Sequence, residues 1–354
     1  MRPFQRNSSS QTLAAALILS ASLLIPATSG WAASSRSALS PTNIFAPVST
    51  PADSIFGLSM FVLAVTGVIF VIVFSLLVYA AIKFRLKAGD SSREPAQIYG
   101  SSQVELAWTV IPVLIVVVLF LAAARVIASI QNAKAPQGAI QVTVIGHQYW
   151  WEYRYPDLKV VTANELHVPV SDPAHPTPTF LTLLSADTDH SFWVPRLAGK
   201  TDLIPNHPNH MWIDPHETGL YLGQCSQYCG VQHALMLLRV YVQTPADFDQ
   251  WIRQQSQPAV VSDKASEGRK IFESTACVNC HTVTGTVAKG IFGPDLTHLM
   301  SRDTIASGAT PNTHDNLRAW IRDPNVLKPG CLMPAMGMSD PQIDAVTAYM
   351  ETLR

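Results

Sequence analysis

The chain has 354 residues, of which 48% are hydrophobic and only 14% are charged. This length corresponds to two or three domains, and the composition is too apolar for a protein that is soluble throughout, so we expect part of the chain to lie in a membrane. The net charge of −1, with no basic stripe in the sequence, argues against nucleic acid or another polyanion as a partner.

The first 33 residues have the features of an export signal. Arg2 and Arg6 precede a short apolar run over 13–25, and small residues follow as far as Ala33. Because a bilayer takes about 20 apolar residues to cross, this run is short for a membrane anchor. We expect the signal to be removed, which leaves a short outer segment over 34–54.

Two long apolar runs predict a transmembrane hairpin within 55–131. The helices are expected over about 55–82 and about 104–130, and each is long enough to span a bilayer. Basic residues outnumber acidic ones in the connecting loop, which places the loop in the cytoplasm. Everything after the hairpin therefore lies in the periplasm or its equivalent, in agreement with the export signal.

Two charged residues interrupt the second run. Arg125 lies near its outer end, from which a long side chain can reach the membrane surface. Glu105 lies at its inner end, and carboxylates are favoured at helix N-termini. The residues alone therefore favour helix capping as the role of Glu105.

The remainder of the chain divides into a β-rich and a helical part. Alternating apolar and polar residues with proline-rich turns predict a β-sandwich or barrel over 139–243. Thr244 and Pro245 give the cap and first-turn proline of a helix, which with a linker fills 244–262. Helical patterns then predict a small, mostly helical domain over 263–354. Its expected helices cover 267–275, 315–322 and 342–353.

A string near the end of the β-rich part carries soft metal ligands. Cys225 and Cys229 offer thiolates, His233 an imidazole and Met236 a thioether, donors that select copper or zinc. Methionine is a poor zinc ligand, so Met236 favours copper. A disulfide between the two cysteines is the alternative in an exported domain. A further imidazole is needed from upstream, and the best candidate is His190, ahead of His167, His175, His207, His210 and His216.

The second string, Cys277-Val-Asn-Cys280-His281, is the attachment signature of haem c. Its cysteines form thioethers, and His281 is the iron ligand. A redox dithiol or half a zinc site is the alternative in a reducing compartment, and the expected export favours haem. Met333 is expected as the sixth ligand, because its segment resembles the sulfur-ligand loop of class I cytochromes c. The competing residues are Met300, Met336 and Met338.

The fifth cysteine, Cys331, has no assigned role. We expect it to be a small buried residue near the haem. Gly293-Pro294-Asp295-Leu296 resembles the segment that packs beside the haem-ligating histidine in cytochromes c. That resemblance implies that the Pro294 carbonyl accepts a hydrogen bond from His281.

Four segments together resemble cytochrome c oxidase subunit II. They are the copper-type string from Cys225 to Met236, the run from His190 to Pro195, the aromatic run from Gly146 to Trp151, and the segment from Glu105 to Pro112. The resemblance covers about residues 50–242. With the haem signature, the whole chain resembles variants that carry a fused C-terminal cytochrome c. It implies a cupredoxin-like Greek-key β-barrel followed by an all-α class I cytochrome c domain.

The resemblance also implies a binuclear copper A centre. Its ligands would be the bridging thiolates of Cys225 and Cys229, the imidazoles of His190 and His233, the weak ligand Met236 and the backbone carbonyl of Gln227. Much of the family has glutamate at position 227, where it helps to hold magnesium, so we expect no tight magnesium binding here. Tyr149 stands where the family usually has tryptophan, and Tyr149 and Trp150 are expected to receive and relay electrons.

The function implied is that of an oxidase subunit II. Electrons from a cytochrome c or the quinol–cytochrome c reductase would pass through haem c and copper A to subunit I, where oxygen reduction to water is coupled to proton pumping. Subunit III and membrane lipid are further expected partners, in the bacterial inner membrane. The resemblance moves Glu105 from capping to the mouth of a proton path. The alternatives are a copper A-containing nitric oxide reductase subunit and a copper-handling protein without turnover.

Overall fold

The computed structural model describes residues 42–85, 97, 99–131, 134–135, 138–172, 174, 176–259 and 265–354. The expected export signal over 1–33 and the candidate ligand His175 lie outside these residues.

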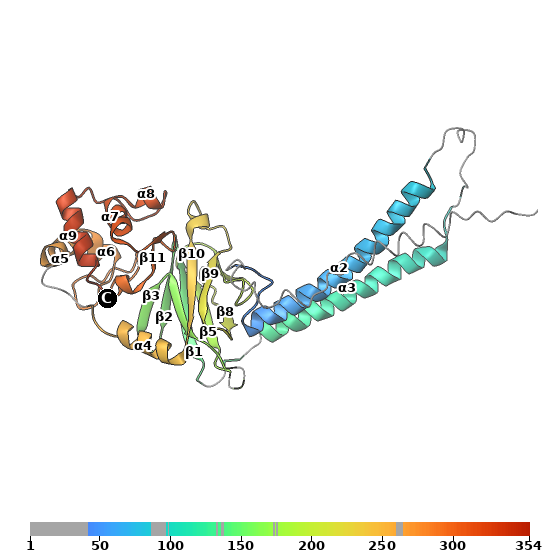
Figure 1. Ribbon diagram of the computed structural model, residues 1–354, viewed down its shortest axis with the longest axis horizontal. Helices are drawn as coiled ribbons and strands as arrows, with labels where there is room; N and C mark the ends of the chain where they lie inside the picture. The colour runs from blue at the N-terminus through green and yellow to red at the C-terminus, as the bar shows by residue number, and fades with distance from the viewer. Residues whose placement is uncertain are drawn as a thin grey trace, which may run out of the picture. The chain divides into compact units, whose positions relative to one another are not determined.

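Two long helices correspond to the predicted hairpin. They are α2 (Thr50–Lys83) and α3 (Ser102–Gln131), drawn in blue and cyan-green in Figure 1. Both are long and apolar enough to cross a membrane, and their apolar stretches are not covered by the rest of the described chain. A helix of a soluble core would be buried, so this exposure favours the membrane. Helix α2 begins before the predicted residue 55, because Pro51 is accommodated in its first turn.

The β-rich part consists of two five-stranded sheets, in agreement with the predicted β-sandwich or barrel. One sheet has the strand order β3-β2-β1-β5-β8 and the other the order β4-β10-β9-β6-β7. The first contains β1 (Ile140–His147), β2 (Trp150–Tyr155), β3 (Val160–Ala163), β5 (Thr179–Ser185) and β8 (Asn209–Ile213). The second contains β4 (Glu165–Pro169), β6 (His190–Trp193), β7 (Thr201–Leu203), β9 (Gly219–Cys225) and β10 (Leu237–Gln243).

The two sheets bury one hydrophobic core between them. Every second residue of β10 is buried, as expected for a strand with one face on a core. The largest core side chains include Trp151, Tyr153 and Phe192, which are at most 1% exposed. Pairs β1–β5 and β4–β10 are parallel and the other pairs are antiparallel. This rigid two-sheet body holds the loops described below.

Helix α4 (Pro245–Gln255) follows the last strand. Its cap is the predicted one, since Thr244 Oγ1 accepts a hydrogen bond from the Asp247 backbone N–H at 3.2 Å. Trp251 on this helix is buried and stacks on His167 of β4, with ring centroids 4.2 Å apart. The helix is thereby fixed to the edge of the second sheet.

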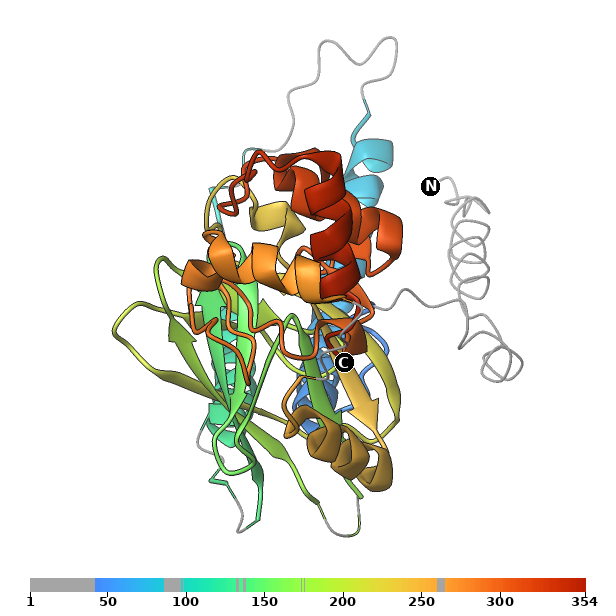
Figure 2. The ribbon, with the colours of Figure 1, turned by 90° about the vertical axis from the view of Figure 1, so that its left-hand side faces the viewer.

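The C-terminal part is the predicted helical domain. Its helices are α5 (Ser266–Ser274), α6 (Cys277–Cys280), α7 (His314–Arg322), α8 (Pro324–Leu327) and α9 (Asp340–Met350). In Figure 2 they form one group, orange to red. Gly268 lets α5 approach the backbone of α9 at Ala345, where a side chain would find no room. A short ribbon of β11 (Thr304–Ile305) and β12 (Thr310–Pro311) completes the domain.

His167 gives the β-rich domain a predictable sensitivity to acid. Its ring lies between Tyr241 and Trp251, and burial lowers the pKa of His167 to about 4. Above pH 6.5 the ring is neutral in both the folded and the unfolded chain. Between pH 6.5 and pH 4 only the unfolded chain takes up the proton, so folding stability should fall by about 3 kcal/mol across this interval.

The His167→Phe variant keeps an aromatic ring between Tyr241 and Trp251 but cannot titrate. We expect the difference in free energy of unfolding between wild type and variant to change by about 3 kcal/mol from pH 7 to pH 4. Urea unfolding followed by tryptophan fluorescence measures this difference. A difference that stays constant over this range would show that His167 is not the group responsible.

Candidate functional site

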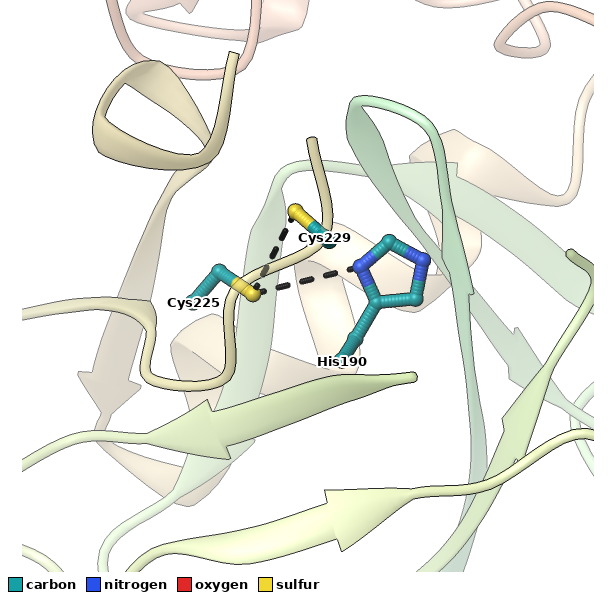
Figure 3. A group of neighbouring side chains, drawn as sticks. All are labelled: His190, Cys225 and Cys229. Atoms are coloured by element: carbon teal, nitrogen blue, oxygen red, sulfur yellow. Dashed lines mark hydrogen bonds between the residues drawn. The ribbon is translucent and has the colours of Figure 1, made fainter. Parts of the chain in front are cut away.

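The loop from Ser226 to Met236, between β9 and β10, carries most of the predicted soft-metal ligands. Strand β6 pairs with β9, and Phe192 lies opposite Cys225. This pairing brings His190, the first residue of β6, beside the loop. Figure 3 shows the side chains of His190, Cys225 and Cys229 pointing toward one another.

The two cysteine sulfurs form the middle of the cluster. Cys225 Sγ lies 3.8 Å from Cys229 Sγ, and both cysteines are free and buried. The disulfide that the sequence left open is therefore not formed. Cys225 Sγ also lies 3.9 Å from His190 Nδ1 and 3.2 Å from the Gln227 carbonyl oxygen.

The other predicted ligands gather around the second sulfur. Cys229 Sγ lies 3.8 Å from His233 Nδ1 and 3.8 Å from Met236 Sδ. His233 begins the 3-10 helix η2 (His233–Leu235), and Met236 directly follows it and is fully buried. The donors thus fall into two groups, one around each sulfur. Such a set exceeds the four donors of a tetrahedral zinc site, and its soft sulfur and imidazole atoms fit copper.

The proximity of the two thiols changes their acidity. The pKa of Cys225 is lowered, chiefly because Cys229 hydrogen-bonds to its sulfur and outweighs the effect of burial. The same pairing raises the pKa of Cys229. One thiolate is therefore stabilised in the pair at neutral pH, and the thiolate is the metal-binding form of cysteine.

Asp187 orients the imidazole of His190. His190 Nε2 lies 2.8 Å from Asp187 Oδ1, and the second carboxylate oxygen accepts the Gln148 backbone N–H at 2.6 Å. This leaves His190 Nδ1 facing the sulfurs, the arrangement expected around a metal-binding histidine. Burial works against ionisation of Asp187, but these hydrogen bonds hold its pKa below the usual value. No sequence motif pointed to Asp187, although it lies three residues before His190.

The other upstream histidines lie outside the cluster. Within the described part of the chain, the group of side chains close enough to share a metal contains His190, Cys225 and Cys229. None of His167, His207, His210 and His216 belongs to it. His216 instead contacts Thr50 at the start of α2, with Nε2 3.0 Å from the threonine oxygen. The choice of His190 from the sequence is consistent with this geometry.

The second predicted string lines an apolar cavity of about 450 Å³, whose wall comes mainly from the helical domain and partly from the β-rich domain. Cys277 and Cys280, on α6, and His281 all contribute to its wall. The rest of the wall is mainly apolar, with Phe272, Leu299, Leu317, Trp320, Ile321 and Val346 among its residues. A cavity with two thiols and an imidazole on an apolar wall fits a covalently attached haem.

The imidazole of His281 is oriented as its sequence context implied. His281 Nδ1 lies 2.8 Å from the Pro294 carbonyl oxygen, which leaves Nε2 free for iron. Burial lowers the pKa of His281, so the ring is neutral and can act as a ligand. Gly293 backs the ring so closely that an added Cβ would lie 2.5 Å from His281 Cε1.

The residues of the cavity wall reduce the number of candidates for the sixth iron ligand but leave more than one. Met333, Met336 and Met338 line the cavity, whereas Met300 does not belong to the described wall. Met333 therefore stays a prediction. Cys331 also lines the cavity, but it is half-buried rather than buried as expected, with Sγ 3.6 Å from the Met333 carbonyl oxygen.

The turn between β1 and β2 joins the two sites. Gln148, Tyr149 and Trp150 line the same cavity as the haem-binding string. Gln148 Nε2 donates a hydrogen bond to the Cys229 carbonyl oxygen at 2.7 Å. An added Cβ on Gly230 would lie 2.4 Å from the Tyr149 hydroxyl. The Tyr149 ring therefore packs closely on the loop from Ser226 to Met236, which we call the ligand loop. Of the two expected relay residues, Tyr149 contacts both the cavity and the loop that carries Cys229, and Trp150 lines the cavity.

Glu105 lies away from both sites. It occupies the first turn of α3, and its carboxylate lies beside Gly100, at the N-terminus of the helix. This position agrees with both the capping role and the location expected for a proton path, so the role of Glu105 stays a prediction.

Gln227 has an exposed side chain and contributes its carbonyl group to the cluster.

Three family models match successive parts of the chain. The model of the cytochrome c oxidase subunit II transmembrane domain matches residues 40–126, and that of its periplasmic domain matches residues 173–243. The cytochrome c model matches residues 265–354. These ranges agree with the division into hairpin, β-rich domain and helical domain.

Curated relatives cover most of the chain. Cytochrome c oxidase subunit 2 of Alkalihalophilus pseudofirmus is 34% identical over 306 residues, which are 84% of this chain and 85% of that protein. The subunit 2 of Bacillus sp. strain PS3 is 32% identical, with 77% and 80% of the two chains covered. The crystal structure of the periplasmic domain of cytochrome oxidase subunit II of Bradyrhizobium japonicum is 28% identical, with a TM-score of 0.32, and covers 34% of this chain and 96% of that domain.

Replacing Gly146 tests whether the position of the His190 imidazole matters for copper binding. An added Cβ at Gly146 would lie 2.8 Å from His190 Cδ2, and His190 is fully buried. The Gly146→Ala variant should therefore displace the imidazole and weaken copper binding about tenfold or more. Competition with a copper chelator measures the affinity.

The matched control is Gly57→Ala, since an added Cβ at Gly57 meets nothing within 4 Å. Its copper affinity should equal that of the wild type. Equal affinity for Gly146→Ala would mean that His190 is not a copper ligand.

Proposed function

This chain belongs to the cytochrome c oxidase subunit II family, and we propose that it conducts electrons from an external donor to the oxygen-reducing subunit I of a haem–copper oxidase. When bound, one covalent haem c and a binuclear copper A centre supply the one-electron chemistry. The observation that carries the proposal is the position of Tyr149. This residue lines the haem cavity and packs on the loop that holds Cys229.

In this proposal the loop from Ser226 to Met236, with Cys225 and His190 beside it, would hold the copper centre. The thiolates of Cys225 and Cys229 would be its central ligands, and the two groups of donors would complete the set. These donors are His190 and the Gln227 carbonyl on one side, and His233 and Met236 on the other. The buried position of both cysteines keeps water away from the sulfurs. No magnesium site is proposed, because the amide of Gln227 supplies no negative charge.

The helical domain holds the haem. Cys277 and Cys280 would form its thioethers, and His281 and Met333 would be the iron ligands. The Pro294 carbonyl fixes the plane of the His281 ring through the 2.8 Å hydrogen bond. A thioether as the sixth ligand gives the high potential that an electron carrier requires.

Helices α2 and α3 anchor both sites to the membrane. Trp212 Nε1, in the β-rich domain, donates a hydrogen bond to the carbonyl oxygen of Ile130 near the end of α3 at 2.9 Å. The backbone of Val48 pairs with that of Arg196 just before α2 begins. We propose that these contacts hold the copper loop at a fixed height above the bacterial inner membrane. Subunit I, and subunit III beside it, are the proposed partners in the lipid.

Replacing one bridging thiolate tests the copper assignment. Cys225→Ser removes a soft ligand shared by both donor groups, so most of the bound copper and its near-infrared absorbance should be lost while haem is retained. Metal analysis and optical spectra of the purified chain provide the measurement. The control Cys331→Ser should keep the wild-type copper-to-iron ratio, and an unchanged ratio in Cys225→Ser would refute the copper site.

Replacing the methionines separately tests the sixth haem ligand. Met333→Ala should leave the iron with an open position, so that the reduced haem binds carbon monoxide and its potential falls. Met336→Ala should keep the wild-type spectrum. Carbon monoxide binding by Met336→Ala but not by Met333→Ala would transfer the ligand to Met336.

A further inference from the structure

The helical domain and the β-rich domain meet through two buried charged side chains. Glu165, on β4, is 1% exposed, and Lys328, in the helical domain, is 2% exposed. Fully buried carboxylates and ammonium groups are rare and costly unless they are paired or hydrogen-bonded. In this chain each of the two charges finds partners across the domain boundary.

Glu165 receives three hydrogen bonds from the helical domain. Its Oε1 accepts the Thr304 backbone N–H at 2.9 Å and the Thr304 hydroxyl at 2.7 Å. Its Oε2 accepts the Asp303 backbone N–H at 3.1 Å. The described structure therefore satisfies both carboxylate oxygens with groups that only the neighbouring domain supplies.

Lys328, in the helical domain, contacts the β-rich domain. Its Nζ donates to the Tyr149 carbonyl oxygen at 2.8 Å and to the Ala306 carbonyl oxygen of its own domain at 3.2 Å. Tyr149 contacts both the cavity and the loop that carries Cys229. The ammonium group thus ties the helical domain to the residue on which electron passage depends in the proposed function.

Leu237 and Ser307 form a further contact between the two domains. The Leu237 backbone N–H donates to the Ser307 carbonyl oxygen at 3.1 Å, and the Ser307 hydroxyl donates to the Leu237 carbonyl oxygen at 3.0 Å. Leu237 is the first residue of β10 and directly follows the ligand Met236. The helical domain therefore also contacts the end of the ligand loop.

Buried charges of this kind select one arrangement rather than add much stability. A packing of the same surfaces that buried either group without partners would cost more than its contacts return. The docked orientation of the described structure satisfies Glu165 and Lys328 together. We propose that these two are positioning residues, which hold the cytochrome domain in a single docked orientation with its haem cavity against Tyr149 and Trp150.

This inference rests on the proposed function, and it adds that the cytochrome domain does not swing on its linker during electron transfer. A tethered but mobile domain would transfer electrons at a rate set by encounter, which depends on viscosity. A docked domain transfers them at a rate independent of viscosity.

The test uses the full-length chain in detergent and the variants Glu165→Gln and Lys328→Met. Each keeps the size of the side chain and removes its charge. Glu267→Gln and Lys270→Met are matched controls, since both residues are exposed in the same helical domain. Thr304→Val is a milder third variant, which removes one hydroxyl donor to Glu165 and serves if the first two misfold.

The first measurement is hydrogen–deuterium exchange of the Leu237, Asp303 and Thr304 amides, and it needs neither copper nor haem. In the docked orientation these three amides donate hydrogen bonds across the domain boundary, so they should exchange about tenfold faster or more in the interface variants, with the controls unchanged. Wild-type exchange in the interface variants would overturn the proposal.

The second measurement is the rate of copper reduction after rapid photoreduction of the haem, at low and high viscosity. The wild-type rate should be independent of viscosity, and the interface variants should be at least about tenfold slower and depend on viscosity. A viscosity-dependent wild-type rate, or wild-type rates in all variants, would overturn the positioning role. Absence of copper or haem from the wild-type chain would instead refute the proposed function, and the exchange measurement would still decide on the docking.

Discussion

The positions of both candidate sites and of the helical domain depend on the turn between β1 and β2. Its Gln148 side chain holds the Cys229 carbonyl oxygen, and its Gln148 backbone binds Asp187, the partner of His190. Its Tyr149 carbonyl receives Lys328 from the helical domain. One short turn therefore orients a ligand loop, a ligand histidine and a neighbouring domain. Its position is fixed in turn by the fully buried Trp151 that follows it in β2.

The sequence was sufficient to predict which side chains gather at the two candidate sites, because most of them lie close together along the chain. Four of the predicted metal ligands fall between Cys225 and Met236, and the predicted haem string is continuous. The prediction of His190 required only that its strand pair with the strand that ends at Cys225. The strand-like pattern around His190 already indicated such a strand. The hairpin was also predictable from composition, except that its first helix begins at Thr50 because Pro51 fits a first helical turn.

The residues that join the two sites were not predictable in the same way. Glu165 and Thr304 are 139 positions apart in the chain, and Lys328 and Tyr149 are 179 positions apart. In the sequence Glu165 is one acidic residue at the start of a strand, with nothing to distinguish it from a solvent-exposed one. Only the docked tertiary structure shows that it is buried and fully hydrogen-bonded. The half-burial of Cys331 likewise depends on how the Met333 loop lies across the cavity.

In the proposed function, the docked arrangement also determines where electrons would enter. Tyr149 and Trp150 are only 9% and 8% exposed, so a soluble donor has little access to the residues that lead to the cysteine pair. Phe292 and Leu332 line the haem cavity as well, yet they are 81% and 68% exposed. A donor would therefore meet this chain at the open rim of the cavity. If the proposed docking holds, fusion of the two domains replaces an intermolecular encounter at Tyr149 with a permanent contact, and the encounter with the donor takes place at the cytochrome surface.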